Sequence, residues 1–284
     1  PVANAVGMLA DKIIENKGKK MVLVSLARAG IPIGILVKRY IKFKYGINVP
    51  HYSISIIRGR GIDDNAMKYL LEKYRPQQIL FVDGWIGKGA ILNELKKDIS
   101  AYEGVSADIA VVADPANVTE LCGTHEDILI PSSCLNSTVS GLISRTFLRD
   151  DIIGRDDFHG AVYYGELTDS DLSYDFIETI EKEFNMENTP DLEKRVESQG
   201  IDEVINIGKN FGIDDINLIK PGIGETTRVL LRRIPWKVLI DERYKGNPQL
   251  EHIVRLAEEK HTPVEYYPLT HYKCCGIIKK LADA

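Results

Sequence analysis

The chain has 284 residues, of which 44% are hydrophobic and 27% are charged, and its 36 Lys+Arg against 41 Asp+Glu give a formal net charge of −5. This composition supplies enough apolar surface to offset chain entropy, which excludes a mostly disordered protein, and the length favours about two domains. All apolar runs are strand-sized, which excludes a transmembrane helix of about 20 apolar residues.

The hydrophobic periodicity predicts alternating helices and strands over the first part of the chain. Helices are expected at residues 3–16, 32–45, 64–73 and 88–100, and strands at 21–26, 51–57, 78–82 and 108–113. This alternation predicts an α/β fold with a mostly parallel sheet and flanking helices, in which ligands bind at the carboxyl ends of the strands.

The rest of the chain departs from that pattern. Residues 116–165 are rich in Ser, Thr, Asn and Cys, which favours an irregular excursion that helps to form a site. Further on, helices are expected at 225–233, 248–260 and 272–281, with strands at 236–240 and 263–267, which form a second small α/β unit. We therefore expect a first domain over residues 1–185, a helical linker over 186–219 and a C-terminal domain over 220–284.

The C-terminal domain is basic although the whole chain is acidic. Residues 220–284 hold 12 Lys+Arg and 8 Asp+Glu, a net charge of +4, which leaves −9 for the remaining residues. A basic module on an acidic body favours a polyanionic partner, with a chance imbalance as the alternative.

The strongest local motif is ILFVDGWIGKGAI at residues 79–91. A buried strand ends at Asp83, and a turn with Gly87, Lys88 and Gly89 opens the next helix. Backbone N–H groups of such a turn can surround an anion at the positive end of a helix, and the lysine adds a full charge. The motif lacks the spacing of a Walker A loop, and a glycine-rich turn without a ligand is the alternative.

Two more strand ends carry arginines. VSLARAGIPIG at residues 24–34 holds Arg28 and Gly30, and SIIRGRGIDD at residues 55–64 holds Arg58 and Arg60 among glycines. The second segment suits a flexible cationic loop that closes over an anionic group, and an exposed basic turn is the alternative.

Together with IPSSCLNSTVSGLISRTFLR at residues 130–149, these segments resemble the type I phosphoribosyltransferases. More specifically, they resemble the bacterial family linked to tellurite-resistance and stress operons. That family is described as a phosphoribosyltransferase domain fused to a pelota-type RNA-binding domain, and it is also labelled the cysteine protease StiP family. The resemblance spans nearly the whole chain. It implies a phosphoribosyltransferase-like sheet at residues 1–185 and a pelota-like domain at 220–284.

The resemblance implies an enzyme that uses phosphoribosyl pyrophosphate as co-substrate and Mg2+ as cofactor. A phosphoribosyl group would move to or from a nucleobase-like small molecule. Asp83, Arg28, Arg58 and Arg60 are then the catalytic candidates, with the arginines on the leaving pyrophosphate. The residues expected to bind the co-substrate are Ala29, Gly30, Gly84, Gly87, Lys88, Gly89 and Ala90.

One departure from the family pattern concerns the ribose. Many type I enzymes have two adjacent acids at the loop start, whereas here Gly84 follows Asp83 and Lys88 stands at a usual Thr position. Either Asp83 alone binds the ribose hydroxyls, or Asp114 at the end of the next strand supplies a second carboxylate. For Asp114, a helix cap before Pro115 is the alternative.

Residues 121–149 carry a rival hypothesis. Cys134 and His125, with Asn136 as a third group, are the residue types of a thiol protease. A buried inert cysteine is the simpler interpretation, and recognition of the acceptor base by Asn136, Ser137 and Arg145 is another. A zinc site of Cys122, His125 and Cys134 lacks a convincing fourth ligand, so no residues are assigned to a resident metal.

The segment PGIGETTRVLLRR at residues 221–233 resembles the glycine-rich helix start with which pelota-type domains contact RNA. Gly224, Glu225 and Arg228 are the RNA-binding candidates, and structured RNA is the implied partner. The alternative is a plain capping box. A non-catalytic regulator that senses a phosphoribosyl ligand is the second functional class that remains open.

The four cysteines, at positions 122, 134, 274 and 275, lack the spacing of a disulfide framework, which favours a reducing cytoplasm. The short apolar runs favour a protein that does not associate with a membrane. The chain starts at Pro1 without a signal-peptide pattern, which suggests a fragment or processed chain that lacks upstream structure. The sequence leaves a homodimer open.

Overall fold

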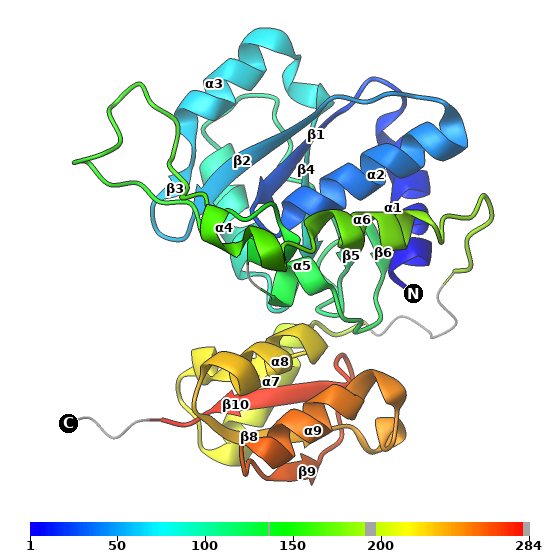
Figure 1. The fold of residues 1–284 in the computed structure, drawn as a ribbon, viewed down its shortest axis with the longest axis vertical. Helices are drawn as coiled ribbons and strands as arrows, with labels where there is room; N and C mark the ends of the chain where they lie inside the picture. Colours follow the sequence, from blue (N-terminus) through cyan, green and yellow to red (C-terminus); the bar gives the residue numbers. More distant parts are fainter. Residues whose placement is uncertain (136, 191–196, 281–284) are drawn as a thin grey trace.

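The computed structural model describes residues 1–135, 137–190 and 197–280. Figure 1 shows a larger α/β body built on one sheet and, packed below it, a smaller α/β body built on another. Among the described residues, no helix combines the length and apolar character that crossing a bilayer requires.

The first sheet has the strand order β3-β2-β1-β4-β5-β6. All neighbours in it run parallel except β3, which returns antiparallel to β2. This confirms the predicted α/β class with a mostly parallel sheet. The strands are β1 (Val22–Ala27), β2 (His51–Ile57), β3 (Gly61–Ile62), β4 (Ile79–Trp85), β5 (Ile109–Ala113) and β6 (Cys122–Thr124).

Helices cover both faces of this sheet because residues alternate along each buried strand. Leu23 and Leu80 point to a core formed with α1 (Val2–Lys17) and α2 (Gly30–Tyr45). Val24 and Phe81 point to the opposite core, formed with α3 (Asp64–Lys73) and α4 (Ala90–Ile99). The two cores hold the strands in register, so that the carboxyl ends of β1, β2 and β4 lie side by side.

The predicted excursion after β5 folds back on the sheet. It contains α5 (Pro131–Cys134) and a short 3-10 turn at Ser137–Val139. A further 3-10 turn at Gly165–Ser170 and helix α6 (Ser173–Glu181) follow it. Isolated bridges join Ile143 to Tyr163 and Phe147 to Gly160. The Ser55 hydroxyl lies 2.7 Å from Thr146 Oγ1 and 2.8 Å from His159 Nδ1, which ties the excursion to β2.

The second sheet has the order β7-β10-β8-β9. Its core holds Val204 and Ile207 of α7, so this helix from the expected linker packs with the C-terminal strands. The elements are α7 (Gly200–Phe211), β7 (Ile219–Pro221), α8 (Ile223–Arg232), β8 (Pro235–Ile240), α9 (Glu251–Glu259), β9 (Val264–Tyr266) and β10 (Cys274–Ile278), with 3-10 turns at Ile216–Leu218, Glu242–Tyr244 and Pro248–Leu250.

One predicted element is wrong in type. The helix expected at residues 272–281 is strand β10, which pairs with β7 on one side and β8 on the other. Two neighbouring strands satisfy its backbone groups, and this tertiary pairing outweighs the helical spacing of the apolar residues.

A buried carboxylate connects the two bodies. Asp127, 2% exposed, accepts hydrogen bonds from the backbone N–H groups of Ile223 (3.0 Å) and Lys273 (2.9 Å). Burial raises the pKa of Asp127 to about 6, against the opposing effect of these hydrogen bonds. The start of α8 is therefore held against the first domain by a side chain of that domain.

Replacing Asp127 by alanine is expected to lower the free energy of unfolding by about 2–3 kcal/mol, because two buried N–H groups lose their acceptor. Urea unfolding of the full chain measures this loss. Glu126→Ala is the matched control, since the side chain of Glu126 is 39% exposed and lies 3.6 Å from Lys273 Nζ, so its removal should cost less than about 1 kcal/mol. Equal losses in the two variants would contradict the anchoring role of Asp127.

Candidate functional site

A cleft opens where β1, β2 and β4 end. It has two adjoining compartments, of about 280 Å³ and 440 Å³. The first is lined by the start of α4 and by residues of the C-terminal domain, and the second by the ends of β1 and β2, α5 and Arg145. The residues common to both compartments are Ala29, Arg58, Asp83, Ile91, Ser133 and Arg228.

Asp83 is the acid at the centre of this cleft. Its position near the end of β4 follows from the buried run before it, and its Oδ1 accepts the N–H of Gly84 at 2.7 Å. Burial raises the pKa of Asp83 to about 7. The carboxyl group therefore changes charge near neutral pH, which is a property of many functional acids.

Gly30, predicted to bind the co-substrate, has a packing role. A Cβ at this position would lie 2.6 Å from the carbonyl oxygen of Val82 and 3.1 Å from the Cα of Asp83. Only glycine allows α2 to start this close to β4. The close approach brings the preceding turn to the cleft, where Arg28 and Ala29 line the second compartment together with Asp83.

A serine hydroxyl of α5 lies beside Gly84, the position at which many type I enzymes have a second acid. A Cβ on Gly84 would lie 2.2 Å from Ser133 Oγ. The hydroxyl oxygens of Ser132 and Ser133 are buried without a hydrogen-bond partner among the described residues, and both serines line the second compartment. A hydroxyl of α5 thus occupies the space into which a side chain at position 84 would extend.

The predicted phosphate loop lines the first compartment with Gly87, Lys88, Gly89 and Ala90. Gly89 has a φ of 85° before α4, a conformation that favours glycine. The Lys88 ammonium donates to the carbonyl oxygens of Ile216 (2.8 Å) and Ile219 (3.0 Å) in the C-terminal domain. Burial lowers the pKa of Lys88 to about 8. The lysine therefore already serves in the contact between domains.

Arginines dominate the charge of the cleft. Arg28, Arg58, Arg145 and Arg228 line the second compartment. Burial lowers the pKa of Arg28, and repulsion from Arg145 and other arginines lowers it further. Arg60 is exposed at the turn between β2 and β3 and lines neither compartment. The predicted flexible loop is thus a tight hairpin in which Arg58 is also exposed but lines both compartments.

The residues predicted to bind the acceptor base do not all lie in the cleft. Arg145 lies in the cleft, whereas the buried Ser137 accepts the N–H groups of Ser140 and Leu142 at its carbonyl oxygen. Asn136 lies outside the described residues.

Asp114 does not line the compartments around Asp83. Its Oδ2 accepts the N–H groups of Val118 (2.7 Å) and Thr119 (2.8 Å). This carboxylate therefore organises the loop after β5.

The predicted RNA-binding helix start faces the first domain. Glu225 and Arg228 line the first compartment and form an ion pair at 2.8 Å. A Cβ on Gly224 would lie 3.4 Å from the Cβ of Cys134. The surface assigned to RNA from the sequence is thus part of the same cleft as Asp83.

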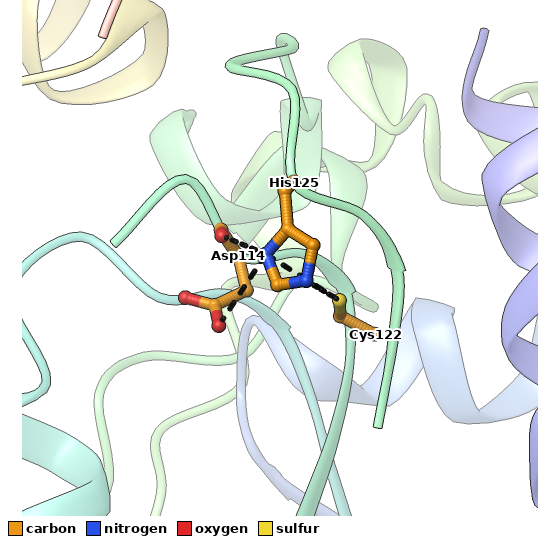
Figure 2. A group of neighbouring side chains, drawn as sticks. All are labelled: Asp114, Cys122 and His125. Carbon is orange, nitrogen blue, oxygen red and sulfur yellow. Dashed lines mark hydrogen bonds and ion pairs between the residues drawn. The ribbon is translucent and has the colours of Figure 1, made fainter. Parts of the chain in front are cut away.

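A second cluster joins Cys122 and His125, which the sequence analysis considered together with Cys134, to Asp114, which it did not place there. His125 contacts Cys122, with Nε2 3.4 Å from Sγ, and its Nδ1 lies 2.8 Å from the carbonyl oxygen of Asp114 (Figure 2). The Asp114 carboxylate lies 3.9 Å from the same Nδ1. Parallel pairing of β5 with β6 brings these residues together, and the spacing of Cys122 and His125 after a short strand was the available signal.

The thiol pairing expected from the sequence differs from this one. Cys134 is buried and lies 3.6 Å from the carbonyl oxygen of Pro131, and burial raises the pKa of its thiol to about 11. Ligand atoms of Asp114, Cys122 and His125 lie within 4.8 Å of one another, so Asp114 takes the place that Cys134 has in the zinc hypothesis. Cys122 itself is 0% exposed.

Comparisons with known proteins identify the family. The model of the tellurite-like stress resistance cysteine protease StiP matches residues 1–181. The chain belongs to the StiP family. The model of the PELOTA RNA binding domain matches residues 198–280. A curated protein of Acinetobacter baylyi, cysteine protease StiP, is 32% identical over 301 residues, which cover 99% of this chain and 78% of that protein.

Similar solved structures cover less of the chain. A hypoxanthine-guanine phosphoribosyltransferase from Bacillus anthracis is 17% identical with a TM-score of 0.31, over 42% of this chain and 69% of that one. HGPRT-ase from Leishmania tarentolae in complex with GMP is 15% identical with a TM-score of 0.32, over 45% and 72%. The comparisons confirm the StiP family and the pelota-type domain. The names of the matched family and of the curated relative favour the cysteine-protease alternative, and the phosphoribosyltransferase activity stays a prediction.

Proposed function

We propose that the cleft binds phosphoribosyl pyrophosphate with Mg2+ and that the enzyme transfers the phosphoribosyl group to or from a base-like acceptor. The observation that carries this proposal is one carboxylate, Asp83, in a cleft that arginines and a glycine-rich loop at a helix start also line. Arginines bind phosphoryl oxygens in bidentate geometry, and backbone N–H groups at a helix start favour a phosphate.

The two compartments suit the two ends of this ligand. The loop at residues 87–90 lies in the first and is suited to the 5′-phosphate, while Arg28 and Arg145 in the second are suited to the pyrophosphate. The ribose would lie between them at Asp83, with the buried hydroxyl of Ser133 beside it. A hydroxyl can donate or accept a hydrogen bond, so it suits a sugar hydroxyl without a second negative charge.

The reaction would develop charge at both reacting centres. The bond between C1 and pyrophosphate breaks with its electron pair on the leaving group, a C1–N bond to the base forms, and the nitrogen proton passes to water. Arg28 and Arg58 would stabilise the negative charge that grows on the leaving pyrophosphate, because preorganised donors are most effective where charge develops.

The residues present fit a magnesium ion. Mg2+ binds oxygen ligands and is usually held by one or two carboxylates together with substrate phosphates, so Asp83 would be its ligand from the protein. When bound, the ion would neutralise charge on the pyrophosphate. The arginines would orient the same group from the other side of the cleft.

Calorimetry with phosphoribosyl pyrophosphate, with and without Mg2+, tests the binding step, and release of pyrophosphate across a panel of bases tests turnover. We expect binding that Mg2+ strengthens, followed by release with at least one base. Binding without release from any base would favour the non-catalytic regulator. Absence of binding under both conditions would contradict the assignment of the cleft.

A thiol hydrolase is the second candidate function. The family and its curated relative are both named for a cysteine protease. His125 contacts Cys122 on one side and Asp114 on the other, as a base does between a nucleophile and an acid. With Nδ1 donating to the carbonyl oxygen of Asp114, Nε2 of His125 would accept the proton of the Cys122 thiol. The complete burial of Cys122 means that a peptide would reach Sγ only after neighbouring residues move.

Peptide hydrolysis assays of cysteine variants decide between the two thiols. If the hydrolase hypothesis holds, Cys122→Ala should lower hydrolysis more than about 100-fold, as loss of a nucleophile does, whereas Cys134→Ala should leave it within about twofold. The reverse pattern would instead support the pair of Cys134 and His125 expected from the sequence. Hydrolysis that survives in both variants rules out either thiol as the nucleophile.

A further inference from the structure

The second compartment gathers positive charge from both domains. Arg28 follows β1, Arg145 lies in the excursion, and Arg228 lies on α8 of the C-terminal domain, yet all three line the same space. Among the described residues, Arg145 forms no ion pair, and Arg228 pairs with Glu225. Asp83 is the acid that lines this compartment. The guanidinium groups thus outnumber the carboxylates that face them.

Burial and mutual repulsion disfavour the charged arginines of the second compartment when no anion is bound. Burial is the largest cause that lowers the pKa of Arg28, followed by repulsion from Arg145, Arg232 and Arg228. The pKa of Arg232 is lowered by burial and then by Arg228 and Arg145. Repulsion across the domain boundary works against docking of α8, and an anion between the groups would remove it.

A buried hydroxyl points to the same space independently of the charges. Ser132 is 4% exposed, it lines the second compartment, and its Oγ has no hydrogen-bond partner among the described residues. A buried polar atom without a partner costs free energy, and a ligand oxygen in the compartment would satisfy it.

We propose that the C-terminal domain completes the ligand site: one phosphoryl group binds jointly to Arg28 and Arg145 of the first domain and to Arg228 of α8. This inference rests on the proposed function for the identity of the ligand, and it adds that the pelota-type domain recognises the substrate. The phosphoryl group would belong to a free sugar pyrophosphate or to the phosphorylated end of an RNA chain. In either case the ligand links the two domains.

The test compares an arginine within α8, Arg228, with the arginine that follows this helix, Arg233, in the full chain. Arg228→Gln should weaken the binding of inorganic pyrophosphate and of phosphoribosyl pyrophosphate at least about tenfold. Arg233→Gln is the matched control, because Arg233 is exposed at the end of α8 and lines neither compartment. Arg228→Lys should recover part of the affinity, since it keeps the charge and loses the planar fork.

A second readout reports on the link between domains. Pyrophosphate should slow hydrogen exchange in peptides that cover α8 in the wild type and in Arg233→Gln, but not in Arg228→Gln. Equal affinities of Arg228→Gln and the wild type, with loss of binding in Arg28→Gln, would overturn the proposal, because the first domain alone would then hold the anion.

Short RNA oligonucleotides distinguish the two sources of the phosphoryl group. Binding of a 5′-phosphorylated RNA that depends on Arg228, beside weak binding of its 5′-hydroxyl counterpart, would assign the site to an RNA end. If such binding occurs without any affinity for phosphoribosyl pyrophosphate, the joint site stands and the proposed function fails. Failure of pyrophosphate, phosphoribosyl pyrophosphate and phosphorylated RNA alike would overturn the joint site.

Discussion

Protonation of Asp83 is expected to weaken the binding of phosphoribosyl pyrophosphate with Mg2+ up to about tenfold for each pH unit below about 7. Asp83→Asn should remove this part of the pH dependence and leave the part that comes from the phosphate groups of the ligand. The pKa of Asp83 is raised to about 7 by burial, so its carboxyl group is neutral in acid and loses its hold on a cation or sugar hydroxyl there. Titration calorimetry from pH 5.5 to 8.5 measures the profile. At pH 8, Asp83→Ala should weaken binding by about 1–3 kcal/mol.

The same carboxyl group gives an independent readout in the absence of ligand. Its raised pKa means that the folded chain binds more protons than the unfolded chain between about pH 4 and pH 7, so its contribution to stability falls as pH rises through that window. Asp83→Asn should therefore raise the urea midpoint at pH 8 and leave it nearly unchanged at pH 4. An identical pH profile in the wild type and the variant would place the titrating group elsewhere.

Arg28→Gln is expected to lower turnover by about 100- to 1,000-fold, the range for loss of a donor that stabilises developing charge. Arg28 lines the cleft beside Asp83 and is partly buried, whereas Arg60 is exposed on the hairpin turn and lines neither compartment. Arg60→Gln is therefore the matched control and should change turnover by less than about threefold. Steady-state release of pyrophosphate measures both variants.

Two results would contradict this assignment. A large loss of turnover in Arg60→Gln would mean that the hairpin between β2 and β3 moves over the ligand, as the sequence pattern of that loop suggested. Equal turnover of Arg28→Gln and the wild type would show that the anion is held without Arg28.

The periodic part of the sequence predicted most of the first domain. Helix α3 spans the residues expected for it, and β1, β2, β4 and β5 lie within a few residues of their predicted positions, because buried parallel strands and amphipathic helices have different apolar spacings. Strand β10 was mistaken for a helix, since its pairing with two other strands depends on residues far away in the chain.

The part of the candidate site that one short segment supplies could be predicted from the sequence. Asp83 and the loop at residues 87–90 follow one another, and they lie in the cleft as the motif indicated. The neighbours of Gly84 and the partner of Lys88 were not predictable. Ser133 and the carbonyl groups of Ile216 and Ile219 reach these positions only through the packing of α5 and the C-terminal domain.

Because a neutral hydroxyl, not a second acid, lies beside Gly84, the charge of the cleft affects the rate at which a ligand binds. Asp83 lines the second compartment together with four arginines, so the cleft keeps a positive field, while residues 1–219 carry a net charge of −9. The net negative charge of these residues repels anions, whereas the positive cleft attracts them. Long-range attraction of this kind is screened over about 10 Å at 0.1 M salt. The rate of encounter with a polyphosphate ligand is therefore controlled by ionic strength, separately from the strength with which the bound ligand is held.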